Sequence, residues 1–199
     1  MANHARKTVF LIGDSIRLGY CGYAKEMLAD IADVYYPEDN CRYVQYTYVC
    51  LQEWKKFFED PDAVDAIVWN NGHWDIAHFD NDPESLNSIE EYTRGLLRIL
   101  RRLRDYFPNA KIVFTTTLPV SPLDYPDWAA PRTSAEIRRY NDAAIEVLGK
   151  EGVIIDDAFE LYKDEPASFF CDCCHLTEEG YTRYAAHIAS IVRGLLEES

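Results

Sequence analysis

The chain has 199 residues, of which 48% are hydrophobic and 27% are charged, which is typical of a soluble globular protein with a single domain (residues 1–199). Its net charge of −14 disfavours nucleic acids and anionic membrane surfaces as partners, because both would repel it. No apolar run approaches the roughly 20 residues of a membrane span. Residues 1–7 leave no room for a signal peptide, so we expect a cytoplasmic protein whose cysteines are free thiols.

Apolar runs and amphipathic segments alternate along the whole chain. The expected strands are residues 8–12, 34–36, 64–69, 111–116 and 153–155. The expected helices are residues 16–31, 51–59, 89–103, 134–148 and 178–195. Capping boxes precede two of these helices, with Ser88 and Glu91 in one and Thr133 and Glu136 in the other. Five strands that alternate with helices predict an α/β fold of three layers, with a doubly wound parallel sheet in the middle.

Nucleophilic and basic side chains follow the first and the last expected strands. Ser15 stands directly after the first strand, and Asp172 and His175 stand between the last strand and the last helix. Because ligands of such sheets bind at the carboxyl ends of the strands, we expect these side chains to meet there. A serine hydroxyl becomes a strong nucleophile when a histidine takes its proton and a carboxylate orients the ring. The pattern favours Ser15 as nucleophile, His175 as general base and Asp172 as the orienting residue.

Each of these residues also has a simpler explanation. Asp14 or Ser15 could only cap the following helix, whose first N–H groups lack acceptors. Asp172 and His175 could be ordinary polar loop residues. The presence of both motifs at the expected ends of an α/β pattern favours a hydrolase over these alternatives.

The same residues carry a resemblance to a known family. Ile12-Gly13-Asp14-Ser15-Ile16 near the N-terminus and Asp172-x-x-His175 near the C-terminus resemble the SGNH (GDSL-type) hydrolase superfamily. The resemblance covers essentially the whole chain. It implies a flavodoxin-like fold and ester hydrolysis without a metal or an organic cofactor. It also implies the same roles for Ser15, His175 and Asp172.

The motifs that supply the family's oxyanion hole differ in this chain. No glycine occurs between Gly22 and Gly72, although the second family motif contributes a glycine N–H from this region. The third motif, usually Gly-x-Asn-Asp, is Gly72-His73-Trp74-Asp75 here, with a tryptophan in place of the asparagine. The resemblance therefore leaves the donors of the oxyanion hole to be assigned from the residues themselves.

We expect three donors to an oxyanion: the backbone N–H groups of Ser15 and Cys41 and the side-chain amide of Asn71. Asn71 follows the third strand, where its amide would face the ester carbonyl that Ser15 attacks. The alternative for residues 70–72 is a turn that only ends the strand. The residues that we expect to contact substrate are Asp14, Asn40, Asn70, Gly72, His73 and Trp74.

These features predict serine-dependent hydrolysis of a small acyl ester, and an O-acetyl group on a carbohydrate is one candidate. Trp74, Tyr125 and Trp128 could stack on a sugar ring, although packing explains each of them equally well. Two other functions stay open. One is a catalytically silent module of the same fold that binds a sugar or a small acid, and the other is an acyltransferase with the same triad.

A cysteine-rich segment near the C-terminus is the other candidate for chemistry. Four potential metal ligands occur within five residues, namely Cys171, Cys173, Cys174 and His175. Zinc ligands usually come as pairs on separate loops, so this spacing is poor for a tetrahedral site. We therefore expect no metal and no cofactor, and a small-molecule ester as the substrate; the oligomeric state stays open.

Overall fold

The computed structural model describes residues 6–122 and 130–197 and contains a sheet of five parallel strands. The strands lie in the order β2-β1-β3-β4-β5, so the strand order reverses between β1 and β3. In doubly wound folds this point is where ligands bind. The strand bounds, each within two residues of the expected range, are β1 Lys7–Ile12, β2 Ala32–Tyr35, β3 Ala66–Trp69, β4 Lys111–Thr115 and β5 Ile154–Asp156.

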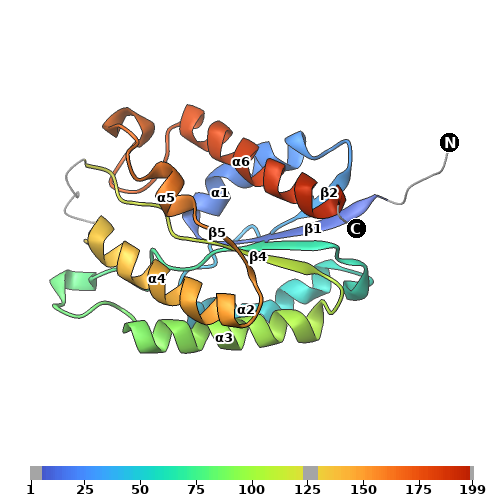
Figure 1. Cartoon of the computed structure of the whole chain (residues 1–199), viewed down its shortest axis with the longest axis horizontal. Coiled ribbons are helices and arrows are strands. Elements are labelled where there is room, and N and C mark those ends of the chain that lie inside the picture. The colour runs from blue at the N-terminus through green and yellow to red at the C-terminus, as the bar shows by residue number, and fades with distance from the viewer. Residues whose placement is uncertain (1–5, 123–129, 198–199) are drawn as a thin grey trace.

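Helices cover both faces of the sheet, which confirms the three-layer α/β/α fold (Figure 1). One face carries α1 (Ser15–Met27), α5 (Ala158–Tyr162) and α6 (Glu178–Glu197). The other face carries α2 (Val44–Trp54), α3 (Ile89–Tyr106) and α4 (Ser134–Lys150). Short 3-10 helices lie in the connections, at η1 Lys55–Phe57, η2 Pro61–Ala63, η3 Phe79–Asn81 and η4 Ala167–Phe169. Within the described residues, every helix is too short or too polar to cross a membrane.

The central strands are apolar along their whole length because helices cover both faces. All four residues of β3 are buried. In β1, Phe10 and Ile12 pack in the layer of α2, α3 and α4, whereas Val9 and Leu11 pack in the layer of α1 and α6. Burial on both faces explains why these strands appear in the sequence as unbroken apolar runs.

The carboxyl ends of β1 and β3 lie next to each other and begin the functional edge of the sheet. Ile12 is paired with Trp69, and the Asn70 N–H donates to the Ile12 carbonyl over 3.0 Å. The residue after β1 is Gly13. An added Cβ there would lie 2.8 Å from the Cβ of Arg17, so only glycine allows the backbone to lie this close to α1. The loops that follow the two strands therefore start side by side.

Both expected capping boxes are present, but α2 begins seven residues earlier than the expected start at residue 51. The N–H of Val44 donates to the Oδ1 atom of Asp75 over 3.0 Å, and Asp75 lies in the loop after β3. This contact caps α2 from a distant segment, so no local pattern indicates it. Two further helices differ from the prediction. Helix α1 ends at Met27 and not at residue 31, and α5 lies where the sequence pattern predicted no helix.

Candidate active site

Ser15 and His175 are hydrogen-bonded at the carboxyl edge of the sheet. Asp14 caps α1, since its Oδ1 accepts the N–H of Ile16 over 3.0 Å, and this cap holds Ser15 in the first turn of the helix. His175 lies in the loop before α6. The Oγ of Ser15 and the Nε2 of His175 are 2.8 Å apart. At this distance the ring can take the hydroxyl proton while the oxygen attacks an ester.

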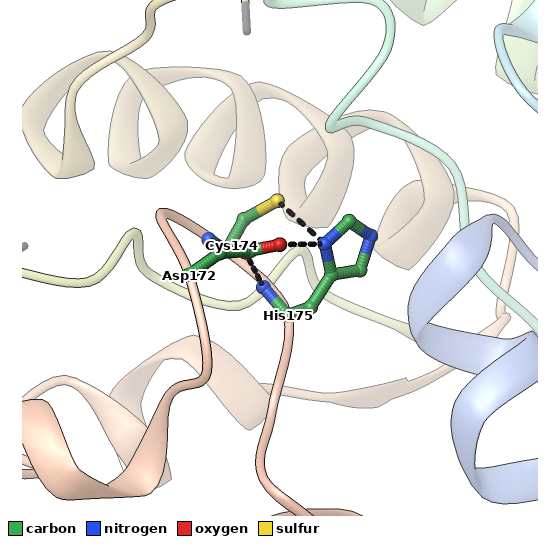
Figure 2. Close-up of side chains that lie close together, drawn as sticks. All are labelled: Asp172, Cys174 and His175. Atoms are coloured by element: carbon green, nitrogen blue, oxygen red, sulfur yellow. Dashed lines mark hydrogen bonds and ion pairs between the residues drawn. The ribbon is translucent and has the colours of Figure 1, made fainter. Parts of the chain in front are cut away.

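Asp172 holds the other nitrogen of the same ring (Figure 2). Its Oδ2 lies 2.7 Å from the Nδ1 of His175, and its Oδ1 accepts the backbone N–H groups of Cys174 (2.9 Å) and His175 (2.7 Å). Burial acts to raise the pKa of Asp172, but these hydrogen bonds outweigh it and lower the pKa below its ordinary value. The ionised carboxylate fixes the proton on Nδ1, which leaves Nε2 as an acceptor toward Ser15.

Cys174 also approaches this ring, with its Sγ 3.8 Å from the Nδ1 of His175 (Figure 2). The ligand atoms of Asp172, Cys174 and His175 lie within 4.8 Å of one another, so their types and spacing could suit a metal ion. Burial raises the pKa of the Cys174 thiol to about 12, whereas metals bind the thiolate. Both nitrogens of His175 are already engaged, by Asp172 and Ser15. The arrangement suits proton transfer better than metal binding.

A cavity of about 310 Å³ lies beside Ser15 and His175, at the lower end of the range for small-molecule sites. Trp74 and Phe79 form an aromatic wall, with ring centroids 5.9 Å apart and planes tilted by 40°. Phe79 is 41% exposed, so its ring is open to a ligand. Tyr125 and Trp128 lie outside the described residues. The cavity is also lined by Asn40, His73, Ala77, Ala130, Arg132, Cys173 and Cys174.

His73 lies in the cavity wall but carries its proton on the opposite nitrogen from His175. The Nε of Arg132 donates to the Nδ1 of His73 over 3.1 Å, so Nδ1 is an acceptor and Nε2 bears the hydrogen. Burial, followed by the positive charges of Arg132 and His175, lowers the pKa of His73 well below its ordinary value. His73 is thus a neutral ring. No sequence motif indicates Arg132, which a tertiary contact brings to the site.

The Cys41 N–H is not available to an oxyanion, which corrects the expectation from the sequence. It donates to the carbonyl of Gly13 over 3.1 Å. The guanidinium of Arg17, which is 1% exposed, donates to the carbonyls of Pro37 (2.6 Å) and Asp39 (2.5 Å) in the same loop. These bonds attach the loop after β2 firmly to α1.

Asn40 lines the cavity in the place expected for Cys41. Its Oδ1 accepts the N–H of Arg42 over 2.9 Å, which forms an Asx turn and fixes the amide. The Nδ2 of Asn40 has no acceptor among the residues that the structure describes. Arg42 then has a φ of 49°, in the left-handed region that a non-glycine residue rarely adopts.

The Asn71 amide does not face the cavity, so its assignment as an oxyanion donor is also corrected. Its Nδ2 donates to the carbonyl of Arg42 (2.8 Å) and to the Oγ1 of Thr47 (2.9 Å). Its Oδ1 accepts the indole N–H of Trp69 over 2.7 Å. Both hydrogens of this fully buried amide are therefore in use, and they tie the loop after β2 to the end of β3.

Three of the six residues expected to contact substrate lie in the cavity wall: Asn40, His73 and Trp74. The other three are engaged in the fold. Asp14 is fully buried as the cap of α1, and the Asn70 amide donates to the Thr115 carbonyl over 2.9 Å. An added Cβ on Gly72 would lie 1.9 Å from the Oγ1 of Thr117, so this glycine serves close packing.

Solved structures with the same fold cover nearly the whole chain. An acetyl xylan esterase matches with a TM-score of 0.72 and 16% identity, over 93% of this chain and 99% of that chain. A carbohydrate acetylesterase from Sinorhizobium meliloti matches with a TM-score of 0.73 and 14% identity, over 96% of this chain and 100% of that chain. An aryl esterase from M. smegmatis matches with a TM-score of 0.69 and 14% identity, over 95% and 99%.

Family membership rests on the sequence. No curated protein matches the chain in sequence. The model of the GDSL-like Lipase/Acylhydrolase family matches residues 11–183, a span that begins in β1 before Ser15 and ends in α6 after His175. The chain therefore belongs to the GDSL-like lipase/acylhydrolase family and is a carboxylic ester hydrolase.

Proposed function

We propose that the chain hydrolyses a small acyl ester through an acyl-enzyme on Ser15, with His175 as general base and acid. The observation that carries this proposal is the continuous hydrogen-bonded chain from Asp172 through both nitrogens of His175 to the Oγ of Ser15. A catalytically silent binding module would not need this arrangement. The same chain of contacts serves an acyltransferase, so water is assigned as the acceptor from the family.

The reaction follows from where the protons lie. Nε2 of His175 takes the Ser15 proton as Oγ bonds to the ester carbon, and the carbonyl electrons move onto the oxygen. The oxyanion collapses, the alcohol leaves with the proton from His175, and the acyl group stays on Ser15. Water then attacks in the same way, since His175 takes one of its protons and returns it to Oγ as the acid leaves. Asp172 stabilises the charged ring in both steps.

We assign the oxyanion hole to the backbone N–H of Ser15 and the side-chain amide of Asn40. Ser15 opens α1, where helix geometry leaves the first N–H groups without intrahelical acceptors and the helix dipole favours negative charge. Asn40 lines the same cavity and its amide is fixed by the Asx turn. Donors held in advance stabilise the oxyanion without a cost of reorganisation.

The proposed substrate is an O-acyl, and in particular O-acetyl, ester of a carbohydrate. Two of the similar structures are an acetyl xylan esterase and a carbohydrate acetylesterase, which supports this substrate class. The Trp74 and Phe79 wall offers an aromatic face beside Ser15, where the apolar face of a sugar ring can stack.

The test is Ser15→Ala with p-nitrophenyl acetate and acetylated xylo-oligosaccharides as substrates. We expect kcat to fall by about 10⁴-fold or more with unchanged thermal unfolding, because the lost hydroxyl leaves no cavity in the core. A fluorophosphonate should add one mass label to the wild-type protein and none to the variant. Cys171→Ala, which removes an exposed thiol near the site, is the matched control and should keep the activity. Near wild-type turnover in Ser15→Ala would end the proposal.

A further inference from the structure

A cation without an ionic partner lies beside the aromatic wall of the catalytic cavity. The guanidinium of Arg42 lies 4.8 Å from the ring centroid of Tyr46 and 5.8 Å from that of Trp74. Trp74, and Asn40 two residues before Arg42 in the sequence, both line the cavity beside Ser15. The side chain of Arg42 thus lies next to the aromatic wall, while Arg42 itself is not among the residues that line the cavity.

No carboxylate of the described residues lies within ion-pair distance of Arg42, and its guanidinium makes no hydrogen bond to any of them. This is notable in a chain where 34 acidic residues outnumber 20 basic ones. Arg132, an arginine that lines the cavity, is committed to His73, to the Ala130 carbonyl and to Cys174. Arg42, beside the aromatic wall, is a guanidinium whose N–H groups have no assigned acceptor in the described part of the chain.

The backbone holds Arg42 in place at an energetic cost. Its φ of 49° lies in the left-handed region, which is unfavourable for a non-glycine residue. The neighbouring contacts enforce this conformation: Asn40 accepts its N–H, and the Asn71 amide donates to its carbonyl. Backbone strain that the surroundings enforce in this way is characteristic of functional positions.

Aromatic stacking also selects the group that Arg42 can bind. A guanidinium that lies over ring faces keeps its N–H groups in its own plane, where they pair with a carboxylate in a bidentate manner. The net charge of −14 repels anions from the protein as a whole. A local cation beside the aromatic wall would offset that repulsion for an anionic substrate and for no other class.

We propose that Arg42 recognises a carboxylate on the alcohol part of the substrate, so that the preferred substrate is an O-acylated acidic sugar of the uronic acid type. This inference rests on the proposed ester hydrolysis at Ser15 and names the class of alcohol. Trp74 contacts the sugar ring, and Arg42 binds the carboxylate on the ring's outer side. The acyl group then lies in the cavity beside Ser15.

The test uses two substrates that differ in this charge and contain no other ester: an acetylated methyl galacturonoside and the same compound with its carboxyl group as a primary amide. The measured quantity is the ratio of kcat/KM for the acid to kcat/KM for the amide, in which effects on the acetyl transfer itself cancel. We expect a ratio of about 10 or more in the wild type, in line with a hydrogen-bonded charge pair. The preference should decline as salt rises from about 0.05 to 0.5 M, since an exposed pair is screened.

Arg42→Met should bring the ratio close to one, mainly through a higher KM for the acid. Arg42→Lys should keep part of the preference, because it retains the charge but loses the bidentate geometry. Arg139→Met, which removes an exposed arginine from α4, is the matched control and should leave the ratio as in the wild type. Thermal unfolding of each variant shows whether the loop after β2 is intact.

The outcome separates this inference from the function on which it rests. If turnover depends on Ser15 but the wild-type ratio is near one, or is unchanged in Arg42→Met, the carboxylate site is refuted and the esterase stands. If Arg139→Met loses the preference to the same extent, the overall charge of the protein causes it and not a contact of Arg42, which would also refute the site. If Ser15→Ala keeps its activity, the proposed function itself fails.

Discussion

The two histidines in the wall of the cavity show how a neighbour decides what an imidazole can do. His175 has a carboxylate, Asp172, at its Nδ1 and Ser15 at its Nε2. His73 has a guanidinium, Arg132, at its Nδ1, and its buried Nε2 has no hydrogen-bond partner among the described residues. The Nε2 of His175 is therefore an acceptor toward the nucleophile, whereas the Nε2 of His73 bears a hydrogen and cannot accept one.

The two histidines also differ in how deeply they are buried. His73 is 3% exposed, and burial is the main cause of its lowered pKa. The His175 side chain is 31% exposed, and a carboxylate accompanies it, so a positive charge on this ring is stabilised during the reaction. A general base needs such a charged state, whereas a wall residue does not. The comparison supports the distinction that the sequence already predicted, with His175 as the base and His73 as a residue of the cavity wall.

The largest effect should come from removing the carboxylate that sets the His175 tautomer. Asp172→Asn keeps the shape of the side chain, but its amide N–H can donate to Nδ1, which puts the ring hydrogen on Nε2. We expect kcat to fall by about 10⁴-fold. A second pair of this kind provides the control. The Nε2 of His187 lies 2.9 Å from the Oδ1 of Asp156, away from Ser15, and Asp156→Asn should keep kcat within about twofold. Equal losses in both variants would contradict the assigned role of Asp172.

A smaller effect should distinguish the two asparagines near the oxyanion site. Asn40→Ala should lower kcat by about 10²-fold with little change in KM or in thermal unfolding, because it removes one oxyanion donor. Asn71→Ala should act mainly on stability, by a few kcal/mol, because it leaves buried partners such as the Arg42 carbonyl without a donor. Steady-state kinetics and urea unfolding of both variants measure this. A reversed pattern would restore Asn71 as the oxyanion donor.

The pH dependence should sharpen the contrast between the two rings. Activity should fall on the acid side, since the protonated form of a general base cannot accept the Ser15 proton. His73 should add no second limb, because its lowered pKa keeps it neutral throughout this range. The measurement is kcat/KM for p-nitrophenyl acetate from pH 5 to 9. An additional limb that disappears in His73→Gln would show that His73 also titrates.

The parts of the molecule that depend on local pattern were predictable, and those that depend on tertiary contacts were not. Periodicity and the two capping boxes predicted the strands and most of the helices. The positions of the two motifs after strands predicted that Ser15 and His175 lie close together. The predicted start of α2 was wrong because the residue that caps this helix is Asp75, which lies 31 residues from Val44 in the sequence. The Cys41 and Asn71 assignments were wrong because a sequence does not show that a donor is already engaged elsewhere, here with Gly13 and with Arg42.

The distant cap of α2 should affect the free energy of unfolding and not the catalytic step. Asp75 is fully buried, and burial raises its pKa to about 7, even though the Val44 N–H and the Asn87 amide stabilise its charge. An unfolded chain releases this proton near pH 3.9. Between about pH 4 and 7 the folded state therefore binds more protons than the unfolded state, and this group makes the free energy of unfolding decline as pH rises.

The contribution of Asp75 should reach at most about 1.4 kcal/mol per pH unit and should level off above about pH 7. Asp75→Asn keeps an acceptor for the Val44 N–H but cannot titrate, so its unfolding free energy should lack this component. Urea unfolding of both proteins at pH 4.5, 6 and 7.5 gives the difference between them. The unfolding free energy of the wild type minus that of Asp75→Asn should become smaller, or change from positive to negative, as pH rises. A constant difference would mean that Asp75 is ionised throughout, and that the cap of α2 is a charged one.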